Sequence, residues 1–350
     1  MQPMNSITTG TETPIRVFST CPAASHVDRE YVAHLIEVAQ WSEEAGCTGS
    51  LIYTDNSLAD PWLIAQLVIQ NTRRLCPLVA VQPVYMHPYS VATMVSSLAG
   101  LHGRPVFLNM VAGGFKNDLV SLDYSTGHDQ RYDRLVEYTE IIQNLLAGDS
   151  PTTLEGQFYR VKNVVLSPAL PESLRGGVLM SGSSPAGLAA ARKTGATAIQ
   201  YPEPPEKRVP VPDGQESGIR VGIIARETEA EAWATAFERF PEDRKGQITR
   251  TLATKVSDSD WHRQLAELAE AAKEHRTTYW LRPFENYHTN CPYLVGNYEQ
   301  VGEEISKYLN LGFRTFILDI PTAKEEFVHI RRVFEMAGAY QTSPTGAVTA

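Results

Sequence analysis

The sequence predicts a single (β/α)₈ barrel. Three observations predict this fold: short apolar strand patterns alternate with amphipathic helix patterns, eight such strands can be counted, and most connections between them are short. The chain has 350 residues, of which 43% are hydrophobic, and this is enough to bury one large core. Because the chemistry of such barrels sits where the strands end, polar residues at those ends are the candidates for a functional site.

The expected elements follow the chain in strand and helix pairs. The expected strands are residues 15–19, 49–54, 75–84, 106–111, 177–182, 196–200, 220–225 and 315–320. The expected helices are residues 28–45, 61–71, 90–101, 130–147, 185–194, 228–240, 297–309 and 324–337. Pro61 and Pro185 stand where a first-turn proline is favourable, and Gly148 is a helix stop.

Three segments depart from this alternation. Residues 152–168 alternate polar and apolar side chains and predict a hairpin outside the barrel. Residues 201–218 are rich in proline and predict a loop, while residues 241–291 are the least periodic and predict an insertion over the active face. The expected organisation is a disordered lead at 1–14, one barrel domain at 15–339 and a disordered tail at 340–350.

Composition and charge exclude several classes of function. A net charge of −9 and no dense cluster of lysine or arginine argue against nucleic acid as a partner. The first fourteen residues have neither a basic start nor an apolar run, so we expect no signal peptide and no membrane span. The four cysteines are scattered, which predicts free thiols in a reducing cytoplasm and no metal site.

The first candidate residue is Asn109, within the strand pattern VFLNMV. An amide inside an otherwise apolar strand must be hydrogen-bonded, and a ligand at the strand's end would serve. Glycines follow directly at 113 and 114. The turn that they form and the loop to His128 are therefore expected around the mouth of the barrel.

Two further patterns each have two interpretations. In SGSSPAG, Ser183 and Ser184 precede a helix start, which suits a phosphate group but also suits an ordinary N-cap serine. In HDQRY, His128 and Arg131 could hold a phosphate or the polar edge of a planar ring. Asp129 could equally be an N-cap, and Arg131 a surface cation.

A looser set of polar residues lies in the predicted loops: His87, Arg282, Tyr287 and His288. They could orient an anionic substrate or protonate a leaving group, or they could be solvated loop residues. The sequence contains no recognisable Ser-His-Asp order, paired-carboxylate motif or Walker motif. It also lacks G-x-G-x-x-G, so a Rossmann dinucleotide site is not supported.

Taken together, several of these stretches resemble a known family. VFLNMVAGG with HDQRY, then SGSSPAG, then YLVGNYEQVGEEISKYLNLGFRTFILDIP is similar to the bacterial-luciferase-like flavin monooxygenases, nearest the alkanesulfonate monooxygenase branch. The resemblance covers roughly residues 15–337, and it rests on the combination of the pieces in this order. It implies a luciferase-like (β/α)₈ TIM barrel that binds reduced FMN at its carboxyl face, usually as a dimer.

The resemblance also assigns roles to individual residues. The cofactor-binding positions that follow from it and from the patterns above are Thr54, Ala80, Asn109, His128, Arg131, Tyr132, Ser183 and Ser184. Arg220 matches an active-site arginine of the alkanesulfonate enzymes. Three other positions depart from that branch, because Leu58 stands for a cysteine, Gly222 for a histidine, and Ile320 or Pro321 for a tyrosine.

The implied activity is that of a two-component monooxygenase. Reduced FMN would come from a separate NAD(P)H:flavin reductase and react with O₂ to a C4a-(hydro)peroxyflavin, which delivers one oxygen atom to a small organic substrate. Arg220, Arg282 or His288 would bind an anionic substrate or move a proton, and the enzyme would be a homodimer or a dimer of dimers. The alternatives are hydride transfer with a deazaflavin and a catalytically silent flavin-binding protein.

Overall fold

The computed structural model of the chain describes residues 14–113, 116–249, 277–286 and 288–342. Its strands are β1 (Arg16–Thr20), β2 (Gly49–Ile52), β3 (Cys76–Val81), β4 (Val106–Val111), β5 (Thr152–Glu155), β6 (Arg160–Val164), β7 (Arg175–Ser181), β8 (Thr197–Gln200), β9 (Ser217–Arg226), β10 (Tyr279–Trp280), β11 (Tyr293–Asn297) and β12 (Thr315–Leu318). Its α-helices are α1 (Arg29–Glu44), α2 (Pro61–Gln70), α3 (Pro88–His102), α4 (Lys116–Ser121), α5 (His128–Ala147), α6 (Pro185–Thr194), α7 (Glu229–Arg239), α10 (Arg282–Glu285), α11 (Tyr298–Asn310) and α12 (Glu326–Thr342).

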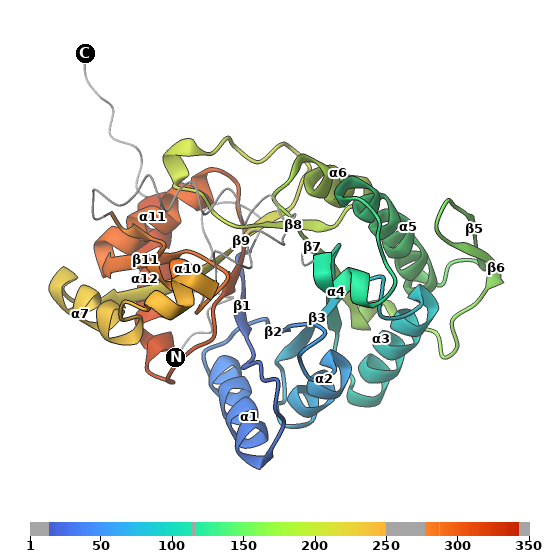
Figure 1. Ribbon diagram of the computed structural model, residues 1–350, viewed down its shortest axis with the longest axis horizontal. Helices are drawn as coiled ribbons and strands as arrows, with labels where there is room; N and C mark the ends of the chain where they lie inside the picture. The colour runs from blue at the N-terminus through green and yellow to red at the C-terminus, as the bar shows by residue number, and fades with distance from the viewer. Residues whose placement is uncertain (1–13, 114–115, 250–276, 287, 343–350) are drawn as a thin grey trace.

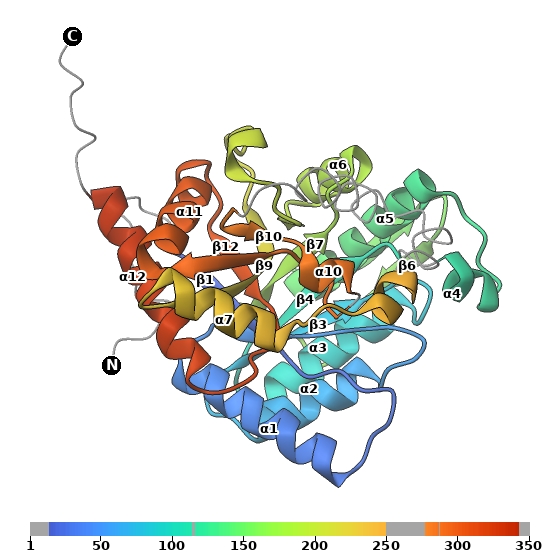
Figure 2. The same ribbon diagram turned by 60° about the vertical axis from the view of Figure 1, so that its left-hand side comes forward.

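Within the described residues, eight parallel strands close into a barrel in the order β1, β2, β3, β4, β7, β8, β9 and β12. β12 returns to β1, where Arg16 lies opposite Thr315, and β8 meets β9 at Ala198 and Ser217. Helices surround this ring of strands, as Figures 1 and 2 show from two directions. The predicted (β/α)₈ fold is confirmed, and each of the eight expected strands overlaps a strand of the barrel.

Side chains that point inward fill the barrel. The interior cluster consists of Phe18, Leu51, Leu78, Ala80, Leu179, Ile199 and Ile317. At the amino ends of the strands, Arg16 donates to Thr197 across 3.2 Å and pairs with Glu216. These contacts tie one end of the barrel together, so the carboxyl ends on the opposite side are the place for a ligand.

β9 is ten residues long and takes part in two kinds of pairing. Its first half, from Gly218 to Val221, pairs with β12 in the barrel. Its second half, from Gly222 to Arg226, pairs with β11, and β10 runs antiparallel to β11. We call β10 and β11 the outer arm. No strand was expected at β10 or β11, so the outer arm is an addition to the predicted fold.

Local signals in the sequence set the helix ends. The Asp60 carboxylate accepts hydrogen bonds from the backbone of Trp62 and Leu63, which caps α2 just before its first-turn proline. Gly148 ends α5 in the left-handed conformation with φ of 67°, as its position predicts. α5 begins at His128, two residues before its predicted start.

The segments outside the barrel follow two of the three expectations. β5 and β6 form the predicted hairpin, which lies beyond α3 and α5 at the edge of the molecule in Figure 1. The proline-rich segment at 201–218 forms the predicted loop as far as the start of β9 at Ser217, and hydrogen bonds from two tyrosines hold it in place. Tyr308 of α11 donates to the carbonyl of Glu203, and Tyr279 of the outer arm donates to the carbonyl of Pro202.

Some of the domain expectations fall largely outside the described residues. Residues 1–13 and 250–276 are among the parts not described, as are residues 343–350, so the disordered ends and most of the insertion remain predictions. The described part of the insertion contains the short strand β10 and the short helix α10.

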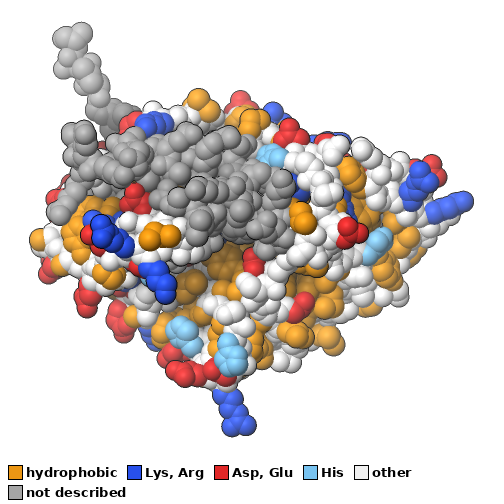
Figure 3. All heavy atoms as spheres, in the orientation of Figure 1, with side chains coloured by type: hydrophobic (Ala, Val, Ile, Leu, Met, Phe, Trp, Pro, Cys, Tyr) orange, Lys and Arg blue, Asp and Glu red, His pale blue; other side chains and the backbone are white. Residues whose placement is uncertain are grey.

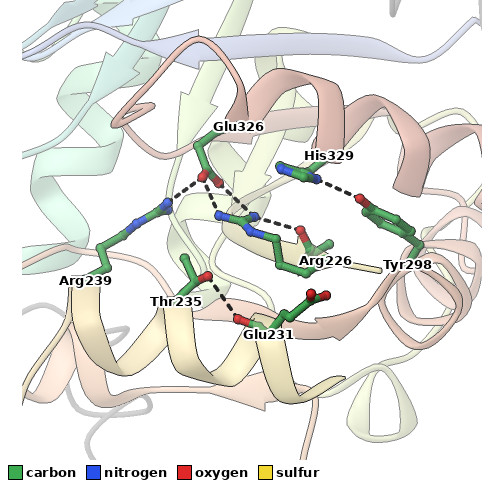
Figure 4. A network of polar contacts seen from close by, with 8 residues as sticks. Arg226, Glu231, Thr235, Arg239, Tyr298, Glu326 and His329 are labelled. Carbon is green, nitrogen blue, oxygen red and sulfur yellow. Dashed lines mark hydrogen bonds and ion pairs between the residues drawn. The ribbon is translucent and has the colours of Figure 1, made fainter. Parts of the chain in front are cut away.

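A buried cluster of charges joins β9, α7 and α12. Glu326 accepts from Arg226 at 2.6 Å and pairs with Arg239 at 2.9 Å, as drawn in Figure 4. Beside it, the Tyr298 hydroxyl and His329 Nδ1 lie 2.7 Å apart. Burial alone would raise the pKa of Glu326, but hydrogen bonds and charge from the two arginines hold that pKa below its ordinary value.

Candidate active site

Asn109 and the serine turn lie side by side at the carboxyl ends of two neighbouring strands. β4 pairs with β7, and the Ser181 hydroxyl donates to the Asn109 amide oxygen across 2.9 Å. Asn109 is only 4% exposed. Because its oxygen is taken by Ser181, the amide group that Asn109 can offer to a ligand is its Nδ2 donor. The expectation that this amide is hydrogen-bonded is thus met within the protein.

Tyr132 of α5 packs onto the serine turn. A Cβ at Gly182 would lie 2.5 Å from the Tyr132 hydroxyl oxygen, and a Cβ at Gly187 would lie 3.1 Å from its ring. Both positions therefore need glycine for Tyr132 to approach. This contact joins the predicted positions on α5 to those on the turn between β7 and α6.

Arg131 is not a surface cation. It is 3% exposed, and its Nη1 donates to the carbonyl of Thr126 across 3.0 Å. Asp129 is not the N-cap of α5 either, because Gly127 takes that position. Asp129 instead lies 2.7 Å from His128 Nδ1, and the His128 ring meets the Tyr132 ring edge-on with centroids 5.3 Å apart.

Ser183 and Ser184 have separate partners. The Ser184 hydroxyl accepts from the backbone N–H of Gly187 and caps α6, as the simpler of its two interpretations requires. The Ser183 hydroxyl accepts from the backbone N–H of Tyr201. Each hydroxyl accepts in these contacts, so each keeps its own hydrogen to donate to an anionic group.

A cavity of about 570 Å³ opens beside this region, between the loops that follow β2 and β3. Thr54 and Ala80 line it together with Leu58 and Tyr85, whereas the other six predicted cofactor positions do not. Its charged lining residues are Asp55 and Asp60, and this set includes no lysine or arginine. Figure 3 shows apolar side chains gathered toward the centre of the face that it displays.

Arg220 of β9 points into the barrel and is 6% exposed. Its guanidinium carbon lies 4.8 Å from the centre of the Tyr53 ring, which packs against the interior cluster. Its Nη2 lies 3.6 Å from Asp319 Oδ1, which is an ion pair without a hydrogen bond. Among the described residues, neither Nε nor Nη2 of Arg220 reaches a hydrogen-bond acceptor.

Asp319 follows β12 and is held by the segment that leads into the outer arm. Its Oδ2 accepts from Thr289 across 2.5 Å and from the Tyr293 hydroxyl across 2.8 Å. The Tyr293 ring fills the space beside Gly222, where a Cβ would lie 2.3 Å from a ring carbon. Gly222 therefore leaves room for Tyr293 to reach Asp319. We call Arg220, Asp319, Tyr293 and Thr289 the arginine cluster.

Two more groups lie close to the arginine cluster. Burial, with the charge of Asp319, raises the pKa of the Cys291 thiol, whose Sγ lies 3.4 Å from the Thr289 hydroxyl oxygen. Burial, then the charges of Cys291, Asp319 and Tyr132, raises the pKa of Tyr201. Tyr201 thus lies within electrostatic range of both the arginine cluster and the Tyr132 side of the site. All four cysteines are free, as predicted, and all four are buried.

The side chains of the other polar residues singled out in the sequence make their contacts outside this group. Arg282 packs over the rings of Phe237 and Trp280. The His288 side chain is 45% exposed and lies 3.4 Å from Asp243.

His87 caps α3 by accepting from the backbone N–H of Tyr89, and Tyr287 lies outside the described residues. Of the three candidates for chemistry, Arg220 is the one whose contacts lie inside the barrel.

Several members of the arginine cluster are not among the residues predicted from the sequence. Asp319 stands directly after the apolar strand pattern TFIL, so it is a charged residue at a strand's carboxyl end and could have been found by that rule. Thr289 and Tyr293 had no such signal, because they reach the site only through the pairing of β11 with β9.

Metal-ligand clusters and membrane-spanning helices are both absent from the described residues. Within these ranges, no three histidine, cysteine, aspartate or glutamate side chains gather as metal ligands would. No helix in the described ranges is long and apolar enough to span a membrane.

The sequence of the chain is similar to sequences of known proteins over most of its length. A model of the luciferase-like monooxygenase family matches residues 13–315. The chain is 34% identical over 330 residues to the 4-(gamma-L-glutamylamino)butanoyl-[BtrI acyl-carrier protein] monooxygenase BtrO of Niallia circulans, covering 92% of this chain and 96% of that protein.

Solved structures share the fold at lower identity. EDTA monooxygenase (EmoA) from Chelativorans sp. BNC1 matches with a TM-score of 0.73 and 15% identity, over 94% of this chain and 95% of that one. The oxygenating constituent of 3,6-diketocamphane monooxygenase from Pseudomonas putida, solved with FMN, matches with a TM-score of 0.65 and 13% identity, over 93% and 97%. F420-dependent enzymes share the fold as well. With a barrel of this topology and a family match over most of its length, the chain belongs to the luciferase-like monooxygenases.

Proposed function

We propose that this enzyme is the oxygenase of a two-component system that uses reduced FMN and O₂ to oxygenate a small organic substrate. One observation carries the proposal: predicted flavin positions from three separate segments of the chain meet at the barrel mouth. Asn109 of β4 bonds to Ser181 of β7, and Tyr132 of α5 packs on the turn that contains Ser183. The FMN-bound relative with the same fold supports this choice of cofactor.

The donors at the site suit FMN. The carbonyl oxygens and ring nitrogens of a flavin accept hydrogen bonds, and the Asn109 Nδ2 group is a buried donor. A phosphate accepts from hydroxyl groups and is favoured at the amino end of a helix, where Ser183 and Ser184 precede α6. Ser184 also caps α6, so the two serines would serve the helix end and the phosphate at the same place. Bound reduced FMN would supply the activation of O₂.

The protein's own tasks are binding, orientation and the exclusion of water. The apolar interior cluster lies directly beneath the site and keeps water from its floor. Arg220 orients the substrate from that floor. Arg282 and His288 remain candidates for moving a proton or for meeting an anionic substrate, although their described contacts lie with α7 and Asp243.

The proposal includes partners and a location. A separate NAD(P)H:flavin reductase would deliver reduced FMN, and the enzyme would act in the cytoplasm as a homodimer or dimer of dimers. The substrate class is open between the sulfonates of the branch that the sequence resembles and an acyl group on a carrier protein, on which BtrO acts. The missing cysteine, histidine and tyrosine of the sulfonate branch favour the second.

Ligand binding tests the cofactor. Under anaerobic conditions we expect reduced FMN to bind more tightly than oxidised FMN, and we expect Asn109→Ala to weaken it. When O₂ is admitted, protein-bound reduced FMN should reoxidise at a rate different from that of free reduced FMN. Reoxidation at the free-solution rate with no measurable binding would remove the basis of the proposal.

One alternative rests on the F420-dependent enzymes that share the fold. In that case the enzyme transfers hydride with a deazaflavin and consumes no O₂. Binding of F420 in preference to reduced FMN, with substrate reduction in the absence of O₂, is the result that favours it. A catalytically silent flavin-binding protein would instead hold oxidised flavin tightly and turn nothing over.

A further inference from the structure

We propose that Arg220 and Asp319 form a neutral recognition pair that holds a carboxamide group of the substrate and disfavours sulfonates and carboxylates. This inference deepens the proposed function by naming a substrate class for its site. It rests on the geometry of the arginine cluster, on the charge of that cluster and on the lining of the neighbouring cavity.

Arg220 has donors to offer. Nε and Nη2 are buried and reach no hydrogen-bond acceptor among the described residues, and leaving a buried donor unpaired is energetically unfavourable. A carbonyl oxygen placed between them removes that cost. The guanidinium rests on the Tyr53 ring, and Tyr53 directly precedes Thr54, which lines the 570 Å³ cavity. Tyr53, Arg220 and Asp319 are not themselves lining residues of that cavity, and we place the carboxamide between the cavity and the pair, beside Tyr53.

Asp319 has capacity to accept. A carboxylate has about four lone-pair sites, and Thr289 and Tyr293 occupy the two on Oδ2. An amide N–H fits a site on Oδ1, the oxygen that faces Arg220. A carboxamide offers an acceptor and a donor side by side, so it complements both members of the pair.

The charges argue against an anion. Asp319 lies 3.6 Å from Arg220 and offsets its charge, so a bound sulfonate or carboxylate would face a buried carboxylate without a free cation to balance it. Asp55 and Asp60 in the lining of the neighbouring cavity add further negative charge, and the lining residues include no lysine or arginine. Repulsion of this kind gives selectivity against the wrong ligand class.

The outer arm fixes this arrangement. Tyr293 reaches Asp319 only because Gly222 has no side chain, and its hydroxyl and Thr289 both hold Oδ2. The carboxylate is therefore turned so that Oδ1 faces Arg220. Asp319 is a positioning residue for Arg220 as well as a partner for the amide.

The test follows the Arg220 Nε–H signal in a nitrogen–proton correlation spectrum of the full-length protein without flavin. Its loss in Arg220→Lys identifies the signal. We expect N-methylacetamide to shift it in a saturable way, and acetate and ethanesulfonate at the same concentration to leave it unchanged. In Asp319→Asn we expect ethanesulfonate to bind about tenfold more tightly or better than in the wild type. Glu335→Gln, which removes a half-exposed carboxylate on α12, is the matched control and should behave as the wild type.

If Asp319→Asn does not fold, the titrations of the wild-type protein with the amide and the two anions still test whether the pair prefers a carboxamide. Anions that shift the signal as strongly as the amide would overturn the proposal, and so would a signal that no ligand moves, as a purely structural ion pair predicts. Because flavin is absent from this experiment, its failure is separate from failure of the reduced-FMN binding test.

Discussion

At the scale of single residues, the absence of a side chain at Gly222 allows Tyr293 to enter the site. The sequence resemblance puts Gly222 where alkanesulfonate enzymes carry a histidine, and in this structure the Tyr293 ring occupies the space next to that glycine. Tyr293 then donates to Asp319, which faces Arg220. The histidine that is missing at position 222 is therefore replaced in space by the Tyr293 side chain, which fills the volume beside Gly222.

A methyl group at position 222 should disturb this packing. In Gly222→Ala the new Cβ would lie 2.3–2.5 Å from Tyr293 ring carbons, so the ring must move. We expect the free energy of unfolding to fall by about 1–3 kcal/mol, as for other overpacked cores. Chemical denaturation measures it. Gly100→Ala is the control, because Gly100 lies within α3 with open space around it, and there alanine should stabilise by about 0.5–1 kcal/mol. Equal effects at both glycines would contradict the packing argument.

Ser183 allows a test of the phosphate position. In Ser183→Ala we expect reduced FMN to bind about tenfold more weakly, because a hydrogen bond to a charged group contributes about 1.5–3 kcal/mol. Reduced riboflavin lacks the phosphate and should bind the variant and the wild type alike. The substitution also removes the contact with the Tyr201 backbone. If both ligands weaken together, the effect is on the turn and the phosphate assignment is wrong.

At the scale of elements, the helices and barrel strands were predictable and the outer arm was not. Pro61, Gly148 and Ser184 act as the sequence indicates, because capping and turn chemistry are local. β11 is a five-residue run placed against β9 by long-range pairing, which leaves no local periodicity to detect.

The charge cluster of Figure 4 joins three elements, so its loss should be costly. Glu326→Gln leaves Arg226 and Arg239 buried beside each other without a carboxylate. We expect the free energy of unfolding to fall by about 3–5 kcal/mol, which is the usual cost of breaking a buried ion pair from one side. Thermal or chemical denaturation measures the change.

The same helix supplies a matched control. Glu335 of α12 pairs with Arg332 at 3.5 Å, and both side chains are about half exposed. Because exposed ion pairs contribute at most about 1 kcal/mol, Glu335→Gln should change stability by no more than that. If the two variants were equally stable, burial would not be the reason for the strength of the Glu326 cluster.

At the scale of the whole molecule, stability should fall as the solution becomes acidic. Burial and the charge of Arg226 lower the pKa of His329 from 6.5, so its stabilising contribution is present above that value and is lost as the pH falls below it. Glu326 also has a lowered pKa, and its contribution is lost below pH 4.5. Urea denaturation between about pH 7.5 and pH 4 should show both losses. In His329→Gln the fall that begins near pH 6.5 should shrink, and an unchanged slope would contradict this assignment.

The barrel could be predicted from the sequence because eight apolar strands and their helices repeat one local pattern. The turn that carries Ser183 and the buried amide of Asn109 could be predicted for the same reason, since both sit at strand ends. The hydrogen bond between Ser181 and Asn109 could not, because it depends on the register of β4 against β7. Asp319 was visible as a charge at a strand's end, but its partners were not.

Because β9 pairs with β12 in the barrel and with β11 in the outer arm, the part of the strand that holds the fold together is separate from the part that shapes substrate selectivity. Four residues of β9 pair with β12 and close the barrel, and the next five pair with the outer arm, whose Tyr293 reaches Asp319. Evolution can therefore exchange the outer arm and leave the barrel intact. Chimeras that swap only this two-stranded piece between relatives are a direct route to catalysts that accept new molecules.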